Sequence, residues 1–277
     1  MLDFAVDLLT NGLLRLPCYA AKASRRRLTS WAASHRAMTS QTLIEYINQV
    51  REWAEGCCAP VFYRDDTDQQ HNGSMTFVDT GQEILGITAG HVADSIIKHC
   101  DSRPGHGCQV GSADLDPNRL IARHQDLDLA TFRLSAPFVT TASKHTVTIP
   151  SWPPRAPRIG ELGLFCGYPG IYRNTRERER QIEVAFLYFV GLVESVSDRH
   201  FGMSLRIAGA YSHGHERVPE HADLGGWSGG AVFRVIEDDV LARLELAGII
   251  YEYSPVSEIV LAHAVSCVGQ NGTFMIA

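Results

Sequence analysis

A proline-rich stretch in the middle of the chain constrains the fold more than any other feature. Residues 148–157 read Thr-Ile-Pro-Ser-Trp-Pro-Pro-Arg-Ala-Pro. Proline cannot donate the backbone hydrogen bond that a central strand requires, so this stretch cannot lie inside a sheet. We interpret it as a connector between two units.

The sequence before the connector has the pattern of an all-β unit. From Ala59 onward, short apolar runs alternate with turns rich in Gly, Asp, Asn and Pro. The predicted strands are Ala59–Arg64, Ser74–Val78, Glu83–Thr88, Gln109–Gly111, Leu120–His124 and Leu129–Leu134. About six strands suffice for one small antiparallel barrel.

A second series of similar length follows the connector. Its predicted strands are Leu162–Cys166, Glu183–Glu194, Met203–Ile207, Gly230–Val235, Leu244–Tyr251 and Ile259–Val265. We predict an exposed loop for the arginine-rich segment Arg173–Arg180. The fold class is therefore predicted to be all-β, with two antiparallel six-stranded β-barrels and an N-terminal helical segment.

The predicted organisation has four parts. Residues 1–56 form an N-terminal extension, 57–150 the first barrel, 151–268 the second barrel, and 269–277 a tail. Within the extension, Ser40–Glu45 resembles a helix start, the apolar residues from Leu43 to Trp53 follow helical spacing, and Gly56 ends the pattern. We predict a docking helix; an inhibitory plug and a targeting piece are the alternatives for residues 1–56.

Composition excludes several classes of protein. The net charge of −6 and the pI of about 6.0 argue against a nucleic-acid binder, which needs a surplus of Lys and Arg on one face. Asn11 and Arg15 interrupt the apolar stretch from Leu8 to Leu16, so we predict neither a signal peptide nor a membrane span. Seven cysteines without metal-type spacing favour reduced thiols and a cytoplasmic location.

The pentapeptide Gly-Trp-Ser-Gly-Gly, residues 226–230, is the most informative short motif. A nucleophilic serine whose neighbouring backbone N–H groups must face an oxyanion needs residues without Cβ beside it. Ser228 is the candidate nucleophile, and the N–H groups of Gly226 and Ser228 are the candidate oxyanion donors. An ordinary glycine-rich hairpin turn is the alternative interpretation.

A candidate base and a candidate carboxylate precede this serine in the chain. His91 follows small residues at the end of an apolar strand, in Thr-Ala-Gly-His, where its ring can turn toward a nucleophile. Asp128 opens a strand in Asp-Leu-Ala, placed to accept the hydrogen bond from the imidazole Nδ1. Asp126 faces the same way in an alternating strand and competes with Asp128.

Together the three motifs resemble the trypsin-like (chymotrypsin-fold) serine peptidases of clan PA, family S1. They are nearest to the bacterial Deg/HtrA-type or intracellular branch, which has TA(A/G)H, DLA and GxSGG segments in the order His, Asp, Ser. The resemblance covers about residues 57–268. Three further segments match: Gly73–Phe77, Gly160–Pro169, and Leu246–Ile250 after the serine. No PDZ-like domain is expected after the last predicted strand.

The resemblance implies a serine endopeptidase that works through an acyl-enzyme, with the active site in the cleft between the barrels. Ser228 would attack the carbonyl, His91 would act as general base, and Asp128 would orient the imidazole. No metal or organic cofactor is implied. The expected partners are a protein or peptide substrate and, as one means of control, a regulatory partner protein.

The sequence departs from the secreted digestive branch at Trp227, where that branch has an aspartate paired with a newly released N-terminus. Activation by that route is not expected. The resemblance places Ala222 at the base of the specificity pocket and Tyr251 and Tyr253 in one wall. His263, on the following strand, is a candidate to line the pocket and select an acidic or amide side chain; the alternative is that it faces solvent or the core. We predict an uncharged or acidic residue before the scissile bond.

Three alternatives accompany the peptidase hypothesis. A catalytically silent binding or scaffold protein would keep the same fold and use the cleft for binding. An α/β-hydrolase esterase would need the order Ser, acid, His and a helix after the serine, and the sequence has neither. A metal site built from His213, His215, Glu216, Glu220 and His221 lacks a strand or helix period that would bring the ligands together.

Overall fold

The computed structural model describes most of the chain beyond the N-terminal extension. The described residues are 49–64, 69–102, 108–149, 151–176, 181–204, 211–212, 224–237, 242–254, 257 and 259–275. Two predictions therefore lie outside them: the start of the N-terminal helix and the role of Ala222. The histidine- and glutamate-rich segment 213–221 is outside them as well.

The first sheet has eight strands and precedes the proline-rich stretch. Its order is β5-β4-β1-β2-β3-β7-β6, and β8 pairs in parallel with β2. The bounds are β1 Cys58–Arg64, β2 Gln70–Asp79, β3 Ile84–Ala89, β4 Cys108–Val110, β5 Ala113–Leu115, β6 Leu120–His124, β7 Leu129–Leu134 and β8 Val147–Thr148. Sequential neighbours pair antiparallel, which places β3 between β2 and β7 and brings the end of β3 beside the start of β7.

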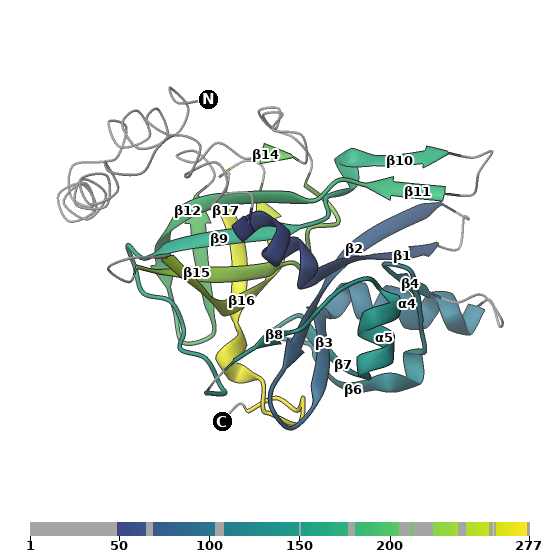
Figure 1. Ribbon diagram of the computed structural model, residues 1–277, viewed down its shortest axis with the longest axis horizontal. Helices are drawn as coiled ribbons and strands as arrows, with labels where there is room; N and C mark the ends of the chain where they lie inside the picture. Colours follow the sequence, from purple (N-terminus) through teal and green to yellow (C-terminus); the bar gives the residue numbers. More distant parts are fainter. Residues whose placement is uncertain are drawn as a thin grey trace.

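The second sheet has seven strands and closes on itself. Its order is β13-β17-β16-β15-β9-β12-β14, and a further pairing between β12 and β13 closes the barrel. The bounds are β9 Leu162–Gly167, β12 Leu187–Val196, β13 His200–Ser204, β14 Tyr211–Ser212, β15 Ala231–Glu237, β16 Ala242–Ser254 and β17 Ile259–Ala264. Figure 1 shows this barrel beside the first sheet, with strands β10 and β11 extending from its edge.

The predicted fold class is confirmed: the chain is mostly β, with one closed barrel, one half-barrel and few helices. The sheets contain eight and seven strands instead of six each. The difference comes mainly from β5, β8 and β14, which are two or three residues long. Such short strands are too brief for an alternating apolar pattern to reveal.

The prediction of a loop for Arg173–Arg180 is wrong for residues 173–176, and residues 177–180 lie outside the described residues. The first half of this segment forms β10 (Arg173–Arg176), which pairs antiparallel with β11 (Gln181–Val184) in a separate two-stranded sheet. The predicted strand Glu183–Glu194 is consequently divided between β11 and β12. Charged residues hid this hairpin, because β-strand prediction depends on apolar and β-branched residues.

Two helices in the first unit were not predicted as helices. Helix α4 (Gly90–Ser102) follows β3 directly, and its residues Val92, Ala93 and Ile96 are buried. Helix α5 (Ala136–Thr141) follows β7; the Ser135 hydroxyl caps it by accepting from the Phe138 N–H. Three short 3₁₀ helices complete the described elements: η2 Pro117–Arg119, η3 Gly170–Tyr172 and η4 Val265–Cys267.

The helix predicted to end at Gly56 is present over residues 49–56. The Trp53 ring packs edge-on against Phe233 of β15, with 5.1 Å between ring centroids. The Lys144 Nζ donates to the Glu55 carbonyl at the helix C-terminus, where a positive charge is favourable. A Cβ at Gly56 would clash with the His145 ring, so glycine permits the close approach that ends the helix.

One apolar cluster crosses from one sheet to the other. It contains Val78, Leu85 and Leu129 of the first sheet together with Leu164, Phe233 and Ile249 of the second. Two smaller clusters lie one in the interior of each unit. Because the shared cluster is buried, it fixes the two sheets against each other and so fixes any site formed between them. Among the described residues, no helix is long and apolar enough to cross a membrane.

Candidate active site

His91 lies in the first turn of α4, immediately after β3 ends at Ala89. The sequence predicted a strand end for this residue, and the structure extends that end into a helix. A Cβ at Gly90 would come 2.7 Å from Arg123 Cζ and 2.8 Å from Asp128 Oδ1, so a larger residue here would displace the side chains around His91. The His91 side chain is 51% exposed, so its ring is open to the cleft.

Asp128 binds His91 through both carboxylate oxygens. Its Oδ2 lies 2.5 Å from His91 Nδ1, and its Oδ1 accepts from the His91 backbone N–H at 2.8 Å. The Asp128 carbonyl accepts from Gly90 N–H at 2.7 Å. Asp128 has a φ of 45°, a left-handed conformation that Asp tolerates better than most residues. Asp126 is exposed and makes none of these contacts with His91.

Arg123 of β6 is a charged neighbour that the sequence analysis missed. Its guanidinium makes two hydrogen bonds to Asp94 of α4, and Nη2 lies 3.7 Å from Asp128 Oδ1. The hydrogen bond to Asp94 raises the pKa of Arg123 above its usual value, with the charge of Asp128 contributing in the same direction. Arg123 thus places a permanent positive charge behind the carboxylate that binds His91.

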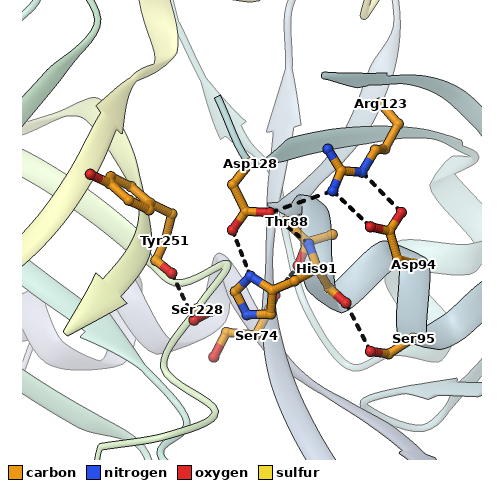
Figure 2. Close-up of polar contacts among 9 residues, drawn as sticks. All are labelled: Ser74, Thr88, His91, Asp94, Ser95, Arg123, Asp128, Ser228 and Tyr251. Carbon is orange, nitrogen blue, oxygen red and sulfur yellow. Dashed lines mark hydrogen bonds and ion pairs between the residues drawn. The ribbon is translucent and has the colours of Figure 1, made fainter. Parts of the chain in front are cut away.

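Ser228 lies in the loop that leads into β15, and this loop faces His91 (Figure 2). The Ser228 Oγ donates to the Tyr251 carbonyl of β16 at 3.1 Å. Among the described residues, no hydrogen bond joins Ser228 Oγ to the His91 ring. Figure 2 shows the His91 ring on the side of Asp128 that faces the Ser228 loop.

The candidate oxyanion donors are both unoccupied by protein groups. Within the described part of the chain, neither the Gly226 N–H nor the Ser228 N–H donates to a protein acceptor. Gly226 and Gly229 each have a φ of 92°, which strongly favours glycine. A Cβ at Gly229 would also collide with the Ser74 carbonyl, so the two glycines flanking Ser228 are required by backbone geometry.

Trp227 points away from the cleft into the second barrel. It is 1% exposed and lies in the cluster with Phe165, Phe189 and Leu224. Its ring centroid is 5.2 Å from that of Phe189. The Trp227 side chain therefore supports the Ser228 loop from within the second barrel.

An open cleft of about 420 Å³ adjoins these residues. Its lining comes from both sheets: Tyr63, His71, Asn72, His91, Val92, Gly170, Ile171, Gly225, Gly226 and Ser228. Tyr63 and His71 pair across β1 and β2 and stack at 5.7 Å between ring centroids. A peptide-sized ligand in this cleft would contact His91 and Ser228 together.

Of the residues predicted for the specificity pocket, the three that the structure describes, Tyr251, Tyr253 and His263, do not line this cleft. Tyr251 contributes its carbonyl to Ser228, while its ring stacks on His263 at 4.2 Å between centroids. His263 is 5% exposed, and its Nδ1 lies 3.1 Å from the Arg199 carbonyl. Burial lowers the pKa of His263, which keeps the ring neutral near pH 7. Tyr253 packs against the core of the second barrel, and Ala222 lies outside the described residues.

Within the described ranges, no group of three or more His, Cys, Asp or Glu side chains is placed to hold a metal ion. The cysteines among them are free; burial raises the pKa of the Cys58 thiol to about 11. The Cys57 Sγ lies 3.1 Å from His145 Nε2, yet burial raises the Cys57 pKa far above its usual value and keeps the thiol protonated. This pair therefore lacks the thiolate that a cysteine nucleophile needs.

Comparison with known proteins gives distant structural similarity alone. No protein-family model matches the chain, and no curated protein sequence matches it significantly. A serine endoprotease from Yersinia pestis is 17% identical with a TM-score of 0.40, covering 79% of this chain and 62% of its own. A Glu endopeptidase is 13% identical with a TM-score of 0.41, covering 75% and 84%.

A third structure, a thermostable serine protease from an extremophilic microorganism, is 13% identical with a TM-score of 0.40, covering 76% of this chain and 91% of its own. The chain thus spans less than two thirds of the Yersinia pestis protein. At these scores the similarity adds no evidence on activity, and the chemistry of this chain has to be inferred from its own residues.

Proposed function

We propose that this protein is a serine endopeptidase of the trypsin-like type, with His91, Asp128 and Ser228 as its catalytic residues. The observation that carries the proposal is the two-point contact between Asp128 and His91, made at 2.5 Å and 2.8 Å beside the Ser228 loop. A surface histidine does not need its ring and its backbone fixed by one carboxylate. A general base does, because proton transfer requires a defined tautomer and orientation.

In the proposed reaction the Ser228 oxygen attacks a peptide carbonyl while His91 Nε2 accepts the hydroxyl proton. Asp128 keeps the other ring nitrogen, Nδ1, protonated and stabilises the imidazolium that forms. The N–H groups of Gly226 and Ser228 bind the developing oxyanion. His91 then returns its proton to the leaving amine, and water releases the acyl group by the same steps in reverse.

Arg123 adds a feature to this scheme. Its charge, 3.7 Å from Asp128 Oδ1, favours the ionised carboxylate. Asp128 Oδ1 contacts both this guanidinium and the His91 backbone N–H, and Asp128 Oδ2 contacts the His91 ring. The carboxylate is thereby held in one orientation throughout the proposed cycle.

A catalytically silent binding protein is the second candidate, and one observation favours it. Ser228 donates to the Tyr251 carbonyl, and its hydroxyl is not engaged by His91. Catalytic hydrogen bonds are often misaligned before substrate binds, so this geometry is also that of a resting enzyme. The two candidates differ in whether Ser228 reacts with an electrophile.

A fluorophosphonate probe separates the two candidates. We expect the probe to label the wild-type protein and to leave Ser228→Ala unlabelled, since labelling needs the activated serine oxygen and the oxyanion site. Ser257→Ala is the matched control and should be labelled like the wild type. A folded wild-type protein that stays unlabelled would contradict the endopeptidase proposal.

Substrate and location belong to the same proposal. The Deg/HtrA-type or intracellular branch supplies the resemblance on which we base a cytoplasmic location and a protein or peptide substrate. The predicted preference for an uncharged or acidic residue before the scissile bond stays a prediction, as does control by a regulatory partner. Proteome-wide cleavage-site identification with wild type and Ser228→Ala tests preference and substrate together.

A further inference from the structure

The loop that carries Ser228 is fixed through its carbonyl groups. In a planar trans peptide the C=O and the following N–H point in opposite directions, so holding a carbonyl also aims the N–H of the same peptide. The Gly225 carbonyl accepts from Gly170 N–H at 2.6 Å, which aims the Gly226 N–H. The Trp227 carbonyl accepts from Gly230 N–H at 2.9 Å, which aims the Ser228 N–H.

Two further carbonyls of the loop, those of Gly226 and Ser228, are both held by one residue of the first sheet, Ser74 on β2. The Ser74 N–H donates to the Ser228 carbonyl at 2.8 Å, and the Ser74 Oγ donates to the Gly226 carbonyl at 3.1 Å. The second contact is the one made by a side chain. It fixes the peptide that joins the two candidate oxyanion donors.

The direction of the Ser74 hydroxyl is determined by its second partner. The Tyr168 N–H donates to Ser74 Oγ at 2.9 Å, so the hydroxyl acts as acceptor there and its single proton is left for the Gly226 carbonyl. Ser74 is fully buried. The Thr88 hydroxyl donates to the Ser74 carbonyl at 2.6 Å and holds the residue in place.

We propose that Ser74 is a positioning residue for the oxyanion site, a role that rests on the proposed function. Gly226 is free to rotate because it has no Cβ, and Trp227 brings no ion pair that would fix the loop. The hydroxyl of Ser74 supplies the missing restraint from the other sheet. Without it the Gly226 carbonyl loses its partner, the peptide between residues 226 and 227 turns, and the two N–H groups no longer converge.

The test compares Ser74→Ala with Thr131→Val. Thr131 is a matched control, since its fully buried hydroxyl also donates to a glycine carbonyl, that of Gly272 at 2.6 Å, but away from the Ser228 loop. We expect Ser74→Ala to lower kcat on a peptide substrate by roughly 10- to 100-fold, somewhat less than deletion of an oxyanion donor. KM should stay within about threefold, and affinity for a peptide aldehyde, which forms the oxyanion, should fall by the same factor as kcat.

Two readouts distinguish positioning from general loss of structure. Thr131→Val should lose a comparable amount of thermal stability and keep kcat within about threefold of the wild type. Amide hydrogen exchange of residues 224–230 should become roughly tenfold faster in Ser74→Ala alone. The proposal is overturned if Ser74→Ala keeps both kcat and aldehyde affinity, or if Thr131→Val loses as much of each.

The exchange measurement also separates this proposal from the proposed function. If the wild type neither hydrolyses peptides nor reacts with a fluorophosphonate, the endopeptidase assignment is wrong. Faster exchange confined to the loop in Ser74→Ala would then still support the restraint by Ser74. Unchanged exchange in that variant would refute the restraint whether or not the wild type is active.

Discussion

At the residue scale, the carboxylate beside His91 shows how backbone conformation selects among equivalent side chains. Asp126 and Asp128 are equivalent in a sequence pattern that alternates, and only the turn before β7 separates them. Asp128 adopts φ 45° there, which directs its carboxylate toward His91 while Asp126 stays exposed. The alternative that the sequence left open is therefore resolved in favour of Asp128 as the partner of His91.

This geometry predicts opposite results for the two substitutions. Asp128→Asn keeps the left-handed turn but presents an amide that stabilises the wrong imidazole tautomer, so kcat should fall by on the order of 10³–10⁴-fold. Asp126→Asn should leave kcat within about twofold of the wild type, because that residue does not touch His91. Steady-state hydrolysis of a peptide ester measures both. Equal losses in the two variants would refute the assignment.

Single residues also mark the limit of prediction from sequence. Ser228, His91 and Asp128 could be found because each has small or glycine neighbours adjacent in the chain that report its environment. Ser74 hydrogen-bonds to Gly226, which is 152 residues away in the sequence, and Arg123 to Asp94, which is 29 residues away. Nothing beside them in the sequence indicates a partner at that distance, so only the folded structure reveals their contacts.

At the element scale, the helix over residues 49–56 joins the two sheets. Trp53 packs on Phe233, in the strand that follows Ser228, and Glu55 accepts from Lys144, whose Nζ also donates to the Tyr168 hydroxyl. Burial lowers the pKa of Lys144. Burying the charged amine costs free energy, and the hydrogen bond to the Glu55 carbonyl at the helix end offsets part of it. The helix and the buried lysine therefore stabilise each other.

Removing the ring of Trp53 tests this docking. Trp53→Ala should reduce the free energy of unfolding by about 2–3 kcal/mol, below the range for a fully buried aromatic because Trp53 is half-buried. Glu52→Ala, on the exposed face of the same helix, should change it by less than about 0.5 kcal/mol. Denaturant unfolding of both variants measures the difference. A Trp53→Ala protein as stable as the wild type would show that the helix contributes no docking energy.

Elements differed in how far the sequence revealed them. Strands β6 and β7 were predicted at their observed bounds because each is continuous and ends in turn residues. Helix α4 was missed although Val92, Ala93 and Ile96 follow helical spacing, since the preceding strand and the histidine motif drew the interpretation toward a strand end. The β10–β11 hairpin lacked an apolar pattern and could not be found in this way.

At the scale of the whole molecule, the candidate site depends on two sheets keeping one relative position. His91 and Asp128 lie in segments next to strands of the first sheet, and Ser228 lies in the loop before β15 of the second. A shared apolar cluster and the contacts of Ser74 cross between the two sheets. The sequence predicted two units and a connector. The shared cluster could not be predicted, because the alternation of apolar residues predicts that a side chain is buried and does not indicate which sheet it packs against.

The shared cluster predicts cooperative unfolding. We expect one calorimetric transition for the whole protein, with equal van't Hoff and calorimetric enthalpies, because neither sheet can unfold without exposing the other's core. The isolated segment 57–150 should correspondingly fail to give a sharp transition of its own. Differential scanning calorimetry of both samples is the measurement. Two resolved transitions in the whole protein would show that the sheets are independent domains.

The buried position of Trp227 also gives the Ser228 loop an optical signal. Indole emission moves to longer wavelength when water reaches the ring, and Trp227 lies one residue before Ser228 with 1% of its surface exposed. A rearrangement that moved the loop away from the barrel would therefore shift the emission maximum of Trp227 to longer wavelength. Fluorescence of a variant whose other tryptophans are replaced by phenylalanine would report the state of the loop without any substrate.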